Sequence, residues 1–552
     1  MRLTHLLTLS AAFISLAALP ALGVSEAKLA PKQVIRVGNG AEPRELDPAK
    51  ATGVPESHIL ENMFECLVLL DPVTMEPTPG TAESWTVSPD GKEYTFIIRK
   101  NAKWSDGKPV TAQDFVYSWT RLLDPATAAE YAYQAYYIKN GEAFNTGKIK
   151  DPTQLGIKAK DDRTVVISLE NPTPFFLSLV AFKNLAPVPK HVIEKFKGAA
   201  EWTKEGNMVS NGPFKLAEWR LNKHVKLVPN EFYWDRAKVK LQEAYMLPIE
   251  NQDTEEKAFF AGELQETNEV PNLKVPLYKQ QISKEPSKYH PFKTPAYLGT
   301  YFFRVNVTKA PMNDKRVRKA LALTIDRELI VSKVTGAGEM PAVAYTPPNT
   351  AGYTPKPVLN TTVKPENIAE AKKLLAEAGY PDGKGLPKIE IHYNTSENHK
   401  KIVTALQQMW KKNLGIEVGL LNEEWKVYLN TQNTMGYQIS RSGWIGDYPD
   451  PNTFLDMFVT GGGNNKTGWG NAEYDAMIKK AGTTLDQKER FAAFQRAEEI
   501  ILDELPIIPV YVYTHKKLIS EKLKLVLDDG RVIPWQAHIL GTLYLKNYAL
   551  AE

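Results

Sequence analysis

Alternation of apolar and polar residues recurs along the chain and predicts a series of short strands. In "EYTFIIRKNAKW", Tyr94, Phe96 and Ile98 occupy every second position, which is the period of a strand with one buried face. The stretches "TVVISLE" and "HVKLVPN" have the same texture. We therefore predict strands at these three places.

A helix is predicted between the first two of these strands. Residues 111–114, "TAQD", place an aspartate three residues after a threonine, a form of the capping box that satisfies free N–H groups at a helix start. Phe115, Trp119 and Leu122 follow at spacings of three to four residues. Residues at that spacing share one face of a helix.

Residues 388–421 combine both periods. "KIEIHYN" alternates as a strand, a helical pattern runs from about Glu397 to Leu414, Gly415 is a helix stop, and "IEVGLL" is a second predicted strand. Strand, helix and strand in this order form a parallel unit. The second half of the chain is therefore predicted to contain a twisted α/β domain.

The N-terminal segment "MRLTHLLTLSAAFISLAALPALG" has a pattern of its own. Arg2 precedes an apolar run from Leu6 to Leu19, and small residues follow before position 24, which is the order of a secretory signal peptide. The alternative is a membrane anchor of nearly sufficient length, against which Pro20 and the cleavage-like small residues argue. We expect residues 1–23 to be removed and the protein to be periplasmic, without a lipid anchor.

Length, charge and cysteine content narrow the class of protein. A chain of 552 residues exceeds what one hydrophobic core serves, so two or three domains are expected. Removal of residues 1–23 takes away only Arg2 and leaves 67 basic against 64 acidic residues, a formal charge of +3, which does not favour nucleic acid as a partner. The one cysteine, Cys66 in the apolar "ENMFECLVLL", is predicted to be a core thiol.

The sequence shows no signature of catalysis or of metal binding. The sequence contains no G-x-S-x-G, no Walker loop, no H-E-x-x-H and no Cys/His spacing that suits zinc. His392 and His399 are the closest histidine pair, and they fall at a strand end and a helix start. We therefore expect no enzyme activity, no metal site and no cofactor.

The stretch "GWIGDYPDPNTF", residues 443–454, presents a different kind of chemistry. Asp447 and Asp450 lie among aromatic, proline and glycine residues, with no Lys or Arg inside the stretch. A buried unpaired carboxylate is costly, so each acid must be solvated, paired with a residue distant in sequence, or available to a cationic ligand. Asp450 lies between two prolines and is predicted to cap the following helix.

The chain as a whole resembles the periplasmic oligopeptide-binding proteins, which load peptides into ABC transporters. The resemblance covers about residues 34–548 and rests on blocks that occur in order: "AEPRELDPAKATGVPES", "NAKWSDGKPVTAQDFVYSW", "VSNGPFKL", "NEFYWD", "APMNDKRVRKAL", "EAKKLLAEAGY", "YNTSENHKK", "MWKKNLGI" and "SRSGWIGDYPDPNTFL".

The resemblance implies an α/β fold of the class II periplasmic binding protein type. Such proteins are bilobed, with three domains, a discontinuous first domain and a hinge between the lobes. The implied boundaries are 24–65 with 190–298 and 513–552 for domain I, 66–189 for domain II, and 299–512 for domain III. Residues 297–300 and 511–513 are expected to form the strands that cross between the lobes.

The resemblance also implies which residues hold the ligand. Asp447 stands where the family pairs an acid with the terminal ammonium of a peptide; the alternative is a turn-capping aspartate. Main-chain contacts to an extended peptide are expected from two segments, at Gly53, Val54, Arg441, Gly443 and Trp444. Aromatic pocket walls are expected at Tyr131, Trp425 and Tyr513, with packing between the lobes as the alternative.

The carboxylate end is where the sequence departs from the family pattern. Arg441 and His399 match positions that meet peptide carboxylates, with an internal salt bridge as the alternative for Arg441. Two further cations of the pattern are absent, because Thr335 and Gln432 stand in their places. A cysteine pair of the enteric members is also absent, and Gly299 and Ile445 stand in its place.

The function implied is capture of short peptides and delivery to the permease subunits of an ABC importer, by a monomer that binds no nucleic acid. A receptor for muropeptides or other modified peptides is the alternative, because "ETNEVPN", residues 266–272, departs from the pattern where a pocket wall is expected. A periplasmic hydrolase and a holdase are the remaining alternatives. Turnover of a peptide mixture would reveal the first, and binding of reduced, unfolded protein the second.

Overall fold

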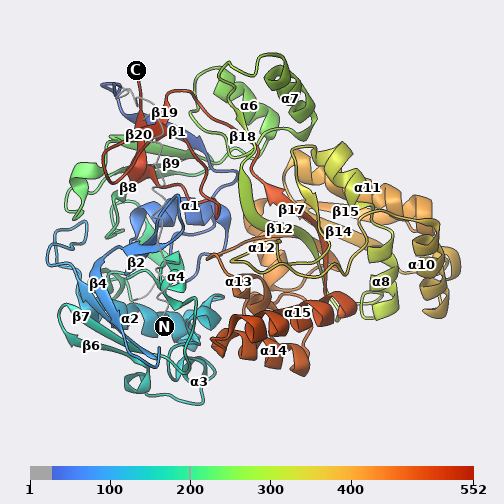
Figure 1. Cartoon of the computed structure of the whole chain (residues 1–552), viewed down its shortest axis with the longest axis horizontal. Coiled ribbons are helices and arrows are strands. Elements are labelled where there is room, and N and C mark those ends of the chain that lie inside the picture. The colour runs from blue at the N-terminus through green and yellow to red at the C-terminus, as the bar shows by residue number, and fades with distance from the viewer. Residues whose placement is uncertain (1–27, 198–199) are drawn as a thin grey trace, which may run out of the picture.

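The chain forms two lobes. The computed structural model describes residues 28–197 and 200–552, so the predicted signal peptide lies outside the described residues. One lobe, here the N/C lobe, holds residues 28–197, 200–293 and 517–552; the other, the middle lobe, holds residues 296–514 (Figure 1). The predicted bilobed α/β architecture is confirmed.

The N/C lobe is built on two four-stranded sheets. The first has the order β1 (Val34–Gly38), β10 (Glu243–Leu247), β9 (His224–Pro229), β8 (Phe214–Arg220). The second has the order β4 (Ala82–Val87), β5 (Glu93–Ile98), β7 (Thr164–Ser168), β6 (Ile157–Asp161). β1 pairs in parallel with β10, so two strands that are far apart in the sequence lie side by side in one sheet.

The C-terminal end of the chain returns to the N/C lobe. A three-stranded sheet there has the order β20 (Val532–Pro534), β19 (Leu523–Val526), β21 (Tyr548–Leu550). β2 (Val68–Leu70) pairs with β3 (Pro77–Pro79) in a small hairpin. One hydrophobic core runs beneath all of these sheets, and Trp104, Trp119 and Trp202 are completely or almost completely buried in it.

The middle lobe is built on one six-stranded sheet. Its order is β13 (Met340–Pro341), β17 (Ile507–Thr514), β12 (Ala296–Val305), β16 (Ile439–Ile445), β14 (Ile389–Asn394), β15 (Val418–Glu423). β12 lies at the centre and pairs antiparallel with both neighbours. β14 pairs in parallel with β15 and, over two residues, with β16.

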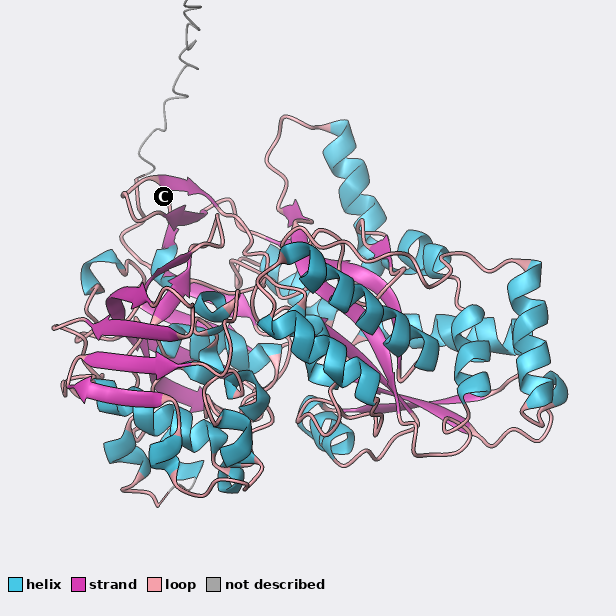
Figure 2. Cartoon of the chain, turned by 60° about the horizontal axis from the view of Figure 1, so that its bottom comes forward, coloured by secondary structure: helices cyan, strands magenta, loops and turns pink. Residues whose placement is uncertain are grey.

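Helices cover the sheets of both lobes, as Figure 2 shows in cyan. The longer ones in the N/C lobe are α1 (Val54–Met63), α2 (Ala112–Leu123), α6 (Gln252–Phe260) and α7 (Val275–Lys284). Those in the middle lobe are α8 (Lys315–Leu323), α10 (Pro365–Glu377), α11 (Glu397–Leu414), α12 (Trp425–Asn433), α14 (Ala472–Thr483) and α15 (Gln487–Glu504). Two short helices matter for the cavity below, α4 (Phe176–Leu179) and α13 (Asn452–Leu455).

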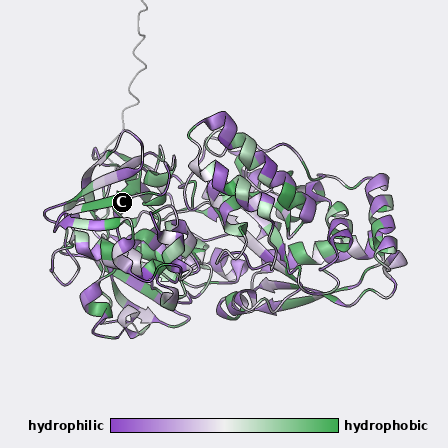
Figure 3. Ribbon diagram, turned by 90° about the horizontal axis from the view of Figure 1, so that it is seen from below, coloured by the Kyte–Doolittle hydropathy of each residue, from purple (hydrophilic) through white to green (hydrophobic). Residues whose placement is uncertain are grey.

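Hydropathy follows these layers. In Figure 3 the helices of the middle lobe alternate between hydrophobic and hydrophilic residues along their length, as expected for helices with one buried face. None of the helices in residues 28–197 and 200–552 has the length and apolar character that a membrane span requires.

The elements predicted from local patterns are confirmed. The alternating stretch became β5, with Tyr94, Phe96 and Ile98 buried, and Thr111 and Asp114 form the capping box of α2. The strand-helix-strand unit became β14, α11 and β15, and Gly415 ends α11 in a left-handed conformation with φ of 71°. Local signals were sufficient here because capping and periodicity agree.

Cys66 is a buried thiol, as predicted. Its Sγ donates a hydrogen bond to the carbonyl oxygen of Phe182, 3.3 Å away, and burial raises the pKa of the thiol. Cys66 lies in the short connection between α1, which ends at Met63, and β2, which begins at Val68.

Two adjacent strands connect the lobes. β12 follows β11 (Phe292–Lys293), and β17 precedes β18 (Lys517–Leu518); β11 pairs with β18, as β12 pairs with β17. The chain therefore passes between the lobes twice, close to the residues predicted for this role, Tyr297 and Tyr513. Each predicted domain contains a sheet of its own; the boundaries themselves stay a prediction.

Candidate ligand-binding site

A cavity of about 310 Å³ is lined by residues of both lobes. All ten residues singled out in the sequence line it: Gly53, Val54, Tyr131, His399, Trp425, Arg441, Gly443, Trp444, Asp447 and Tyr513. Four of them belong to β16 or the turn after it, and Tyr513 belongs to β17. Gly53 and Val54 lie at the start of α1, Tyr131 lies in the turn before Ala132, and His399 and Trp425 belong to α11 and α12. The fold thus brings the predicted residues to one place.

Asp447 lies in the turn after β16 and opens to this cavity. Its carboxylate accepts hydrogen bonds from the Tyr131 hydroxyl at 3.3 Å, the Thr453 hydroxyl at 3.4 Å and the Gln134 amide at 3.5 Å. Within the described residues it accepts no backbone N–H bond and has no basic nitrogen within 4.0 Å, so a turn-capping role is not seen. Burial raises the pKa of Asp447 to about 7.

Asp450, three residues later, has the opposite surroundings. Its two carboxylate oxygens bind the Arg490 guanidinium of α15 at 2.5 and 2.9 Å. It also accepts the backbone N–H of Asn452, the first residue of α13, at 2.9 Å. Asp450 was predicted to cap α13, but the N-cap residue is Pro451, and Asp450 binds the first N–H of the helix from one position earlier. Its main partner is an arginine forty positions away that local sequence did not reveal.

Aromatic side chains surround Asp447. Tyr131 contacts Trp444 at a ring separation of 6.0 Å and Phe182 at 5.0 Å. Trp444 is buried, and its indole N–H has no partner among the described residues. The low polarity of this wall strengthens any charge pair formed at Asp447.

Gly443 is required by close packing. A Cβ atom placed there would lie 2.5 Å from the hydroxyl oxygen of Tyr513. The same hydroxyl accepts a hydrogen bond from Arg441 at 2.8 Å. The glycine therefore lets β17 deliver its tyrosine against β16, where it holds the arginine.

Arg441 is a guanidinium without an acidic partner. It donates to Tyr513 and, at 3.3 Å, to Asn394, and it lies 4.8 Å from the Tyr301 ring. Among the described residues its buried Nε has no acceptor, and no carboxylate lies within 4.0 Å of the guanidinium. The alternative of an internal salt bridge is therefore contradicted, and the charge faces the cavity.

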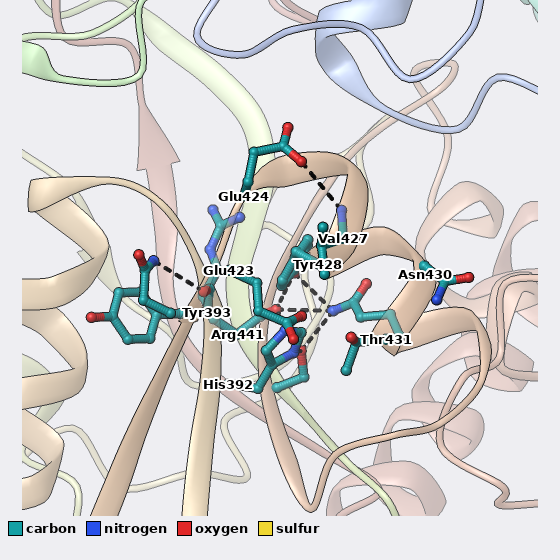
Figure 4. Close-up of polar contacts among 12 residues, drawn as sticks. His392, Tyr393, Glu423, Glu424, Val427, Tyr428, Asn430, Thr431 and Arg441 are labelled. Carbon is teal, nitrogen blue, oxygen red and sulfur yellow. Dashed lines mark hydrogen bonds and ion pairs between the residues drawn. The ribbon is translucent and has the colours of Figure 1, made fainter.

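Gln432, which replaces an expected cation, supports Arg441 from behind. Its amide nitrogen donates to the Tyr428 hydroxyl at 2.8 Å, to Ser440 at 2.9 Å and to the carbonyl of Arg441 at 3.1 Å. His392 continues the network to Ser440 at 3.0 Å (Figure 4). The glutamine thus serves the backbone of β16 and adds no charge.

Thr335, the other replacement, lies outside the cavity lining. It is buried, and its hydroxyl donates to the carbonyl of Val331 at 3.4 Å. His399 does line the cavity, but burial lowers the pKa of its imidazole well below the usual range, with Arg441 and Lys516 adding to the effect. At neutral pH, His399 is a neutral hydrogen-bonding group.

Gly53 and Trp425 meet across the lobes. Gly53 precedes α1, and a Cβ there would lie 2.7 Å from the Trp425 ring and 2.1 Å from Glu56. The Trp425 indole in turn donates to Glu56 at 3.4 Å. Val54, the first residue of α1, is exposed beside this contact.

Gly299 and Ile445 occupy facing positions on β12 and β16. A Cβ at Gly299 would lie 2.4 Å from Cδ1 of Ile445. The isoleucine side chain therefore fills the space that the absent cysteine pair leaves.

Sequence reasoning missed nine charged residues of the lining: Glu61, Glu130, Lys183, Glu250, Glu269, Arg304, Lys466, Lys516 and Lys517. Lys516 is already neutralised, since it pairs with Glu269 at 2.9 Å and with Glu339 at 3.3 Å. Glu269 belongs to the "ETNEVPN" stretch, which does form part of the wall. Lys183 carried a signal, because it is the one charged residue in the apolar stretch 171–189.

Comparison with known proteins agrees with this geometry. Residues 76–466 match the family described as bacterial extracellular solute-binding proteins, family 5 middle. The chain is 43% identical over 486 residues to the periplasmic murein peptide-binding protein MppA of Escherichia coli K12, with 88% of each chain covered.

Solved structures agree as well. Haemophilus influenzae OppA in complex with the peptide RPPGFSPFR has a TM-score of 0.87 at 36% identity, with 95% of this chain and 100% of the other covered. The unliganded open form of MppA has a TM-score of only 0.62 at 40% identity, over 96% and 99%. The lobes are thus arranged as in the complex, and the chain belongs to family 5 of the bacterial extracellular solute-binding proteins.

Proposed function

We propose that this chain is a periplasmic receptor that captures short peptides in extended conformation between its lobes and delivers them to the permease subunits of an ABC importer. The observation that carries the proposal is one cavity with opposite unpaired charges, the Asp447 carboxylate and the Arg441 guanidinium. A free peptide has an ammonium and a carboxylate at its ends. Each would supply the counter-ion that the protein lacks.

A free strand edge supports an extended ligand. β14 pairs with β16 only at Ile439 and Ser440, whereas β12 pairs with β16 along its whole length. From Arg441 to Ile445 one edge of β16 therefore has no strand partner among the described residues. A peptide that adds there bonds through its main chain, irrespective of its side chains.

The remaining lining suits varied peptides. Tyr131, Trp425 and Tyr513 would offer aromatic walls, and amides such as Asn394 and Asn268 would offer adaptable polar contacts. Water that bridges such groups tolerates different side chains. No step in this function requires catalysis, a metal or a cofactor.

The proposal includes export and a monomeric state. Cleavage of residues 1–23 would give a mature N-terminus between Val24 and Lys28, free of lipid, and a periplasmic protein. N-terminal sequencing of the processed protein tests this part. A product that keeps Met1 and sediments with membranes would contradict it.

The ligand class is tested with whatever small molecule copurifies. Mass spectrometry of the denatured, purified protein should find short peptides. Calorimetry should then show that free tri- and tetrapeptides bind, and that the same peptides bind poorly once N-acetylated, because the acetyl group removes the ammonium. Equal affinity for free and acetylated peptides would remove Asp447 from the binding role.

A muropeptide is the second candidate ligand, favoured by the 43% identity to a murein peptide-binding protein. The altered wall that includes Asn268 and Glu269 is where such a ligand would differ. Competition in the same calorimeter decides, since a murein tripeptide that displaces ordinary peptides at lower concentration would make it the preferred ligand.

A further inference from the structure

A side pocket of about 40 Å³ adjoins the cavity next to Asp447. The side pocket and the main cavity share six lining residues, which form the neck between them: Glu61, Phe182, Lys183, Asp447, Leu540 and Thr542. Beyond this neck the walls are mostly apolar, with Phe64, Leu69 and Leu70 among them. The volume suits a small group and is too small for a long side chain.

Lys183 stands at the neck and has no hydrogen-bonding partner in the part of the chain that the structure describes. It follows α4, is 4% exposed, and its ammonium lies 4.1 Å from the centre of the Phe182 ring and 5.5 Å from that of Tyr131. Among the described residues its Nζ has neither a hydrogen-bond acceptor nor a carboxylate within 4.0 Å. The aromatic faces stabilise the cation only in part.

Glu61 supplies a second carboxylate at the neck. It belongs to α1, and its Oε2 is buried without a hydrogen-bond partner among the described residues. Burial raises the pKa of Glu61 to about 7, and Lys183 opposes the shift. Asp447 responds to the same lysine, which lowers its pKa against the effect of burial.

The charges at the neck are therefore two acids and one base. His538 also lines the side pocket, but it is neutral at pH 7 because burial lowers its pKa to about 4. One further positive charge balances the group. The terminal ammonium of a peptide supplies this positive charge, whereas a second cation on the peptide would leave excess positive charge in a site of low polarity.

We propose that Lys183 and Glu61 complete the amino-terminal subsite, so that it accepts peptides with a small uncharged first side chain and rejects a basic one. This inference rests on the proposed function, because it takes Asp447 to bind the ammonium. The first side chain branches from the carbon that bears this ammonium, and the side pocket lies directly beside it. Lys183 is then a specificity-determining residue that acts by charge.

Three peptides that differ only in the first residue separate size from charge. Alanine fits the side pocket, norleucine adds length without charge, and lysine adds both. For the parent protein we expect affinity to fall in that order, with lysine about ten- to a hundredfold weaker than norleucine. Calorimetry at pH 7.5 measures all three.

Lys183→Met removes the charge and keeps most of the volume. In this variant the lysine of the ligand would itself balance Asp447 and Glu61, so the preference for norleucine over lysine should vanish or reverse. Glu61→Gln is the reciprocal change and should weaken the alanine peptide. The double variant Lys183→Met, Glu61→Gln should restore binding of the alanine peptide above that of Glu61→Gln.

The outcomes are distinct. The same norleucine-to-lysine ratio in the parent and in Lys183→Met, within about threefold, would overturn this inference alone. Failure of the parent to bind any of the three peptides would overturn the proposed function and this inference with it. Should Lys183→Met not fold, Glu61→Gln provides the test. Its excess positive charge should enlarge the norleucine-to-lysine ratio, and an unchanged ratio would be equally decisive against the inference.

Discussion

The two ends of the cavity are built in different ways. At the acid end, Asp447 of the middle lobe receives hydrogen bonds from Tyr131 and Gln134 of the N/C lobe. At the basic end, Arg441 is held by Asn394 and Tyr513, both of the middle lobe. The acid end is therefore complete only when the lobes are together, whereas the basic end exists within one lobe.

The two ends also teach which charges the protein neutralises by itself. Asp450 has Arg490, and Lys516 has Glu269 and Glu339. Asp447 and Arg441 have no such partners among the described residues. Along β16 and the turn after it they are six residues apart, at most roughly 20 Å in an extended chain, and the charges left unpaired are those a ligand would meet.

The largest effect is expected from removing the charge at the acid end. Asp447→Asn keeps the shape but leaves a buried ammonium without its counter-ion, which costs about 2–5 kcal/mol, roughly thirty-fold to several thousand-fold in affinity. Calorimetry with a free peptide measures the loss. The melting temperature of the empty variant should be equal to or above that of the parent, since the buried carboxylate is costly.

Asp450→Asn is the matched control for this variant. It leaves Arg490 buried without its partner, so it should destabilise the fold by about 3–5 kcal/mol while the ratio of affinities for free and acetylated peptides stays the same. If Asp447→Asn instead lowered the melting temperature and kept that ratio, the two acids would not differ as described.

The basic end should give the next largest effect. Arg441→Gln removes the guanidinium, and a charge-assisted hydrogen bond to a carboxylate contributes about 1.5–3 kcal/mol, roughly ten- to a hundredfold. The parent should prefer free peptides over C-terminally amidated ones, and the variant should lose that preference. A preference retained by Arg441→Gln would place carboxylate recognition elsewhere.

Acidification should weaken binding at the acid end alone. The pKa of Asp447 is about 7 in the empty protein and only its carboxylate form pairs with an ammonium. Affinity should therefore fall about tenfold at pH 6 and about a hundredfold at pH 5, relative to pH 8. Asp447→Asn should show a flatter profile, and a flat profile in the parent would contradict the raised pKa.

The stability of the empty protein should respond with the opposite sign. The pKa of Asp447 in the folded protein, about 7, exceeds the ordinary value of 3.8, so the folded state binds the proton of this carboxyl more tightly than the unfolded state does. The contribution of Asp447 to stability is thus largest below pH 4 and is lost as the pH rises through 7. Melting curves of the parent and of Asp447→Asn across this range isolate it.

The smallest effect is a change in shape. Because the acid end joins the two lobes, a free peptide should favour the closed arrangement by its differential affinity. Solution scattering should show compaction when a free peptide is added, and less compaction with an acetylated peptide at saturation. An unchanged radius in a verified complex would mean that the lobes do not move.

Much of the architecture followed from local sequence. β14, α11 and β15 were predicted within two residues of their observed ends, because Ser396 caps the helix, Gly415 terminates it, and the period changes at each boundary. Seven of the ten candidate site residues lie in the sequence blocks that carry the family resemblance, whereas Tyr131, Trp425 and Tyr513 lie outside these blocks; all ten line one cavity. Where a residue's surroundings are its own neighbours in the chain, sequence determines them.

Tertiary structure alone decided which charges are satisfied. Asp450 and Asp447 stand three residues apart in one polar and aromatic stretch, yet only the folding of α15 against that stretch brings Arg490 to the first. Lys183 and Glu61 of the N/C lobe line the same side pocket as Asp447, and Gln432 binds the backbone of β16. Electrostatic partners are chosen by distance in space and by burial, which depend on how the lobes pack, and neither is encoded in local periodicity.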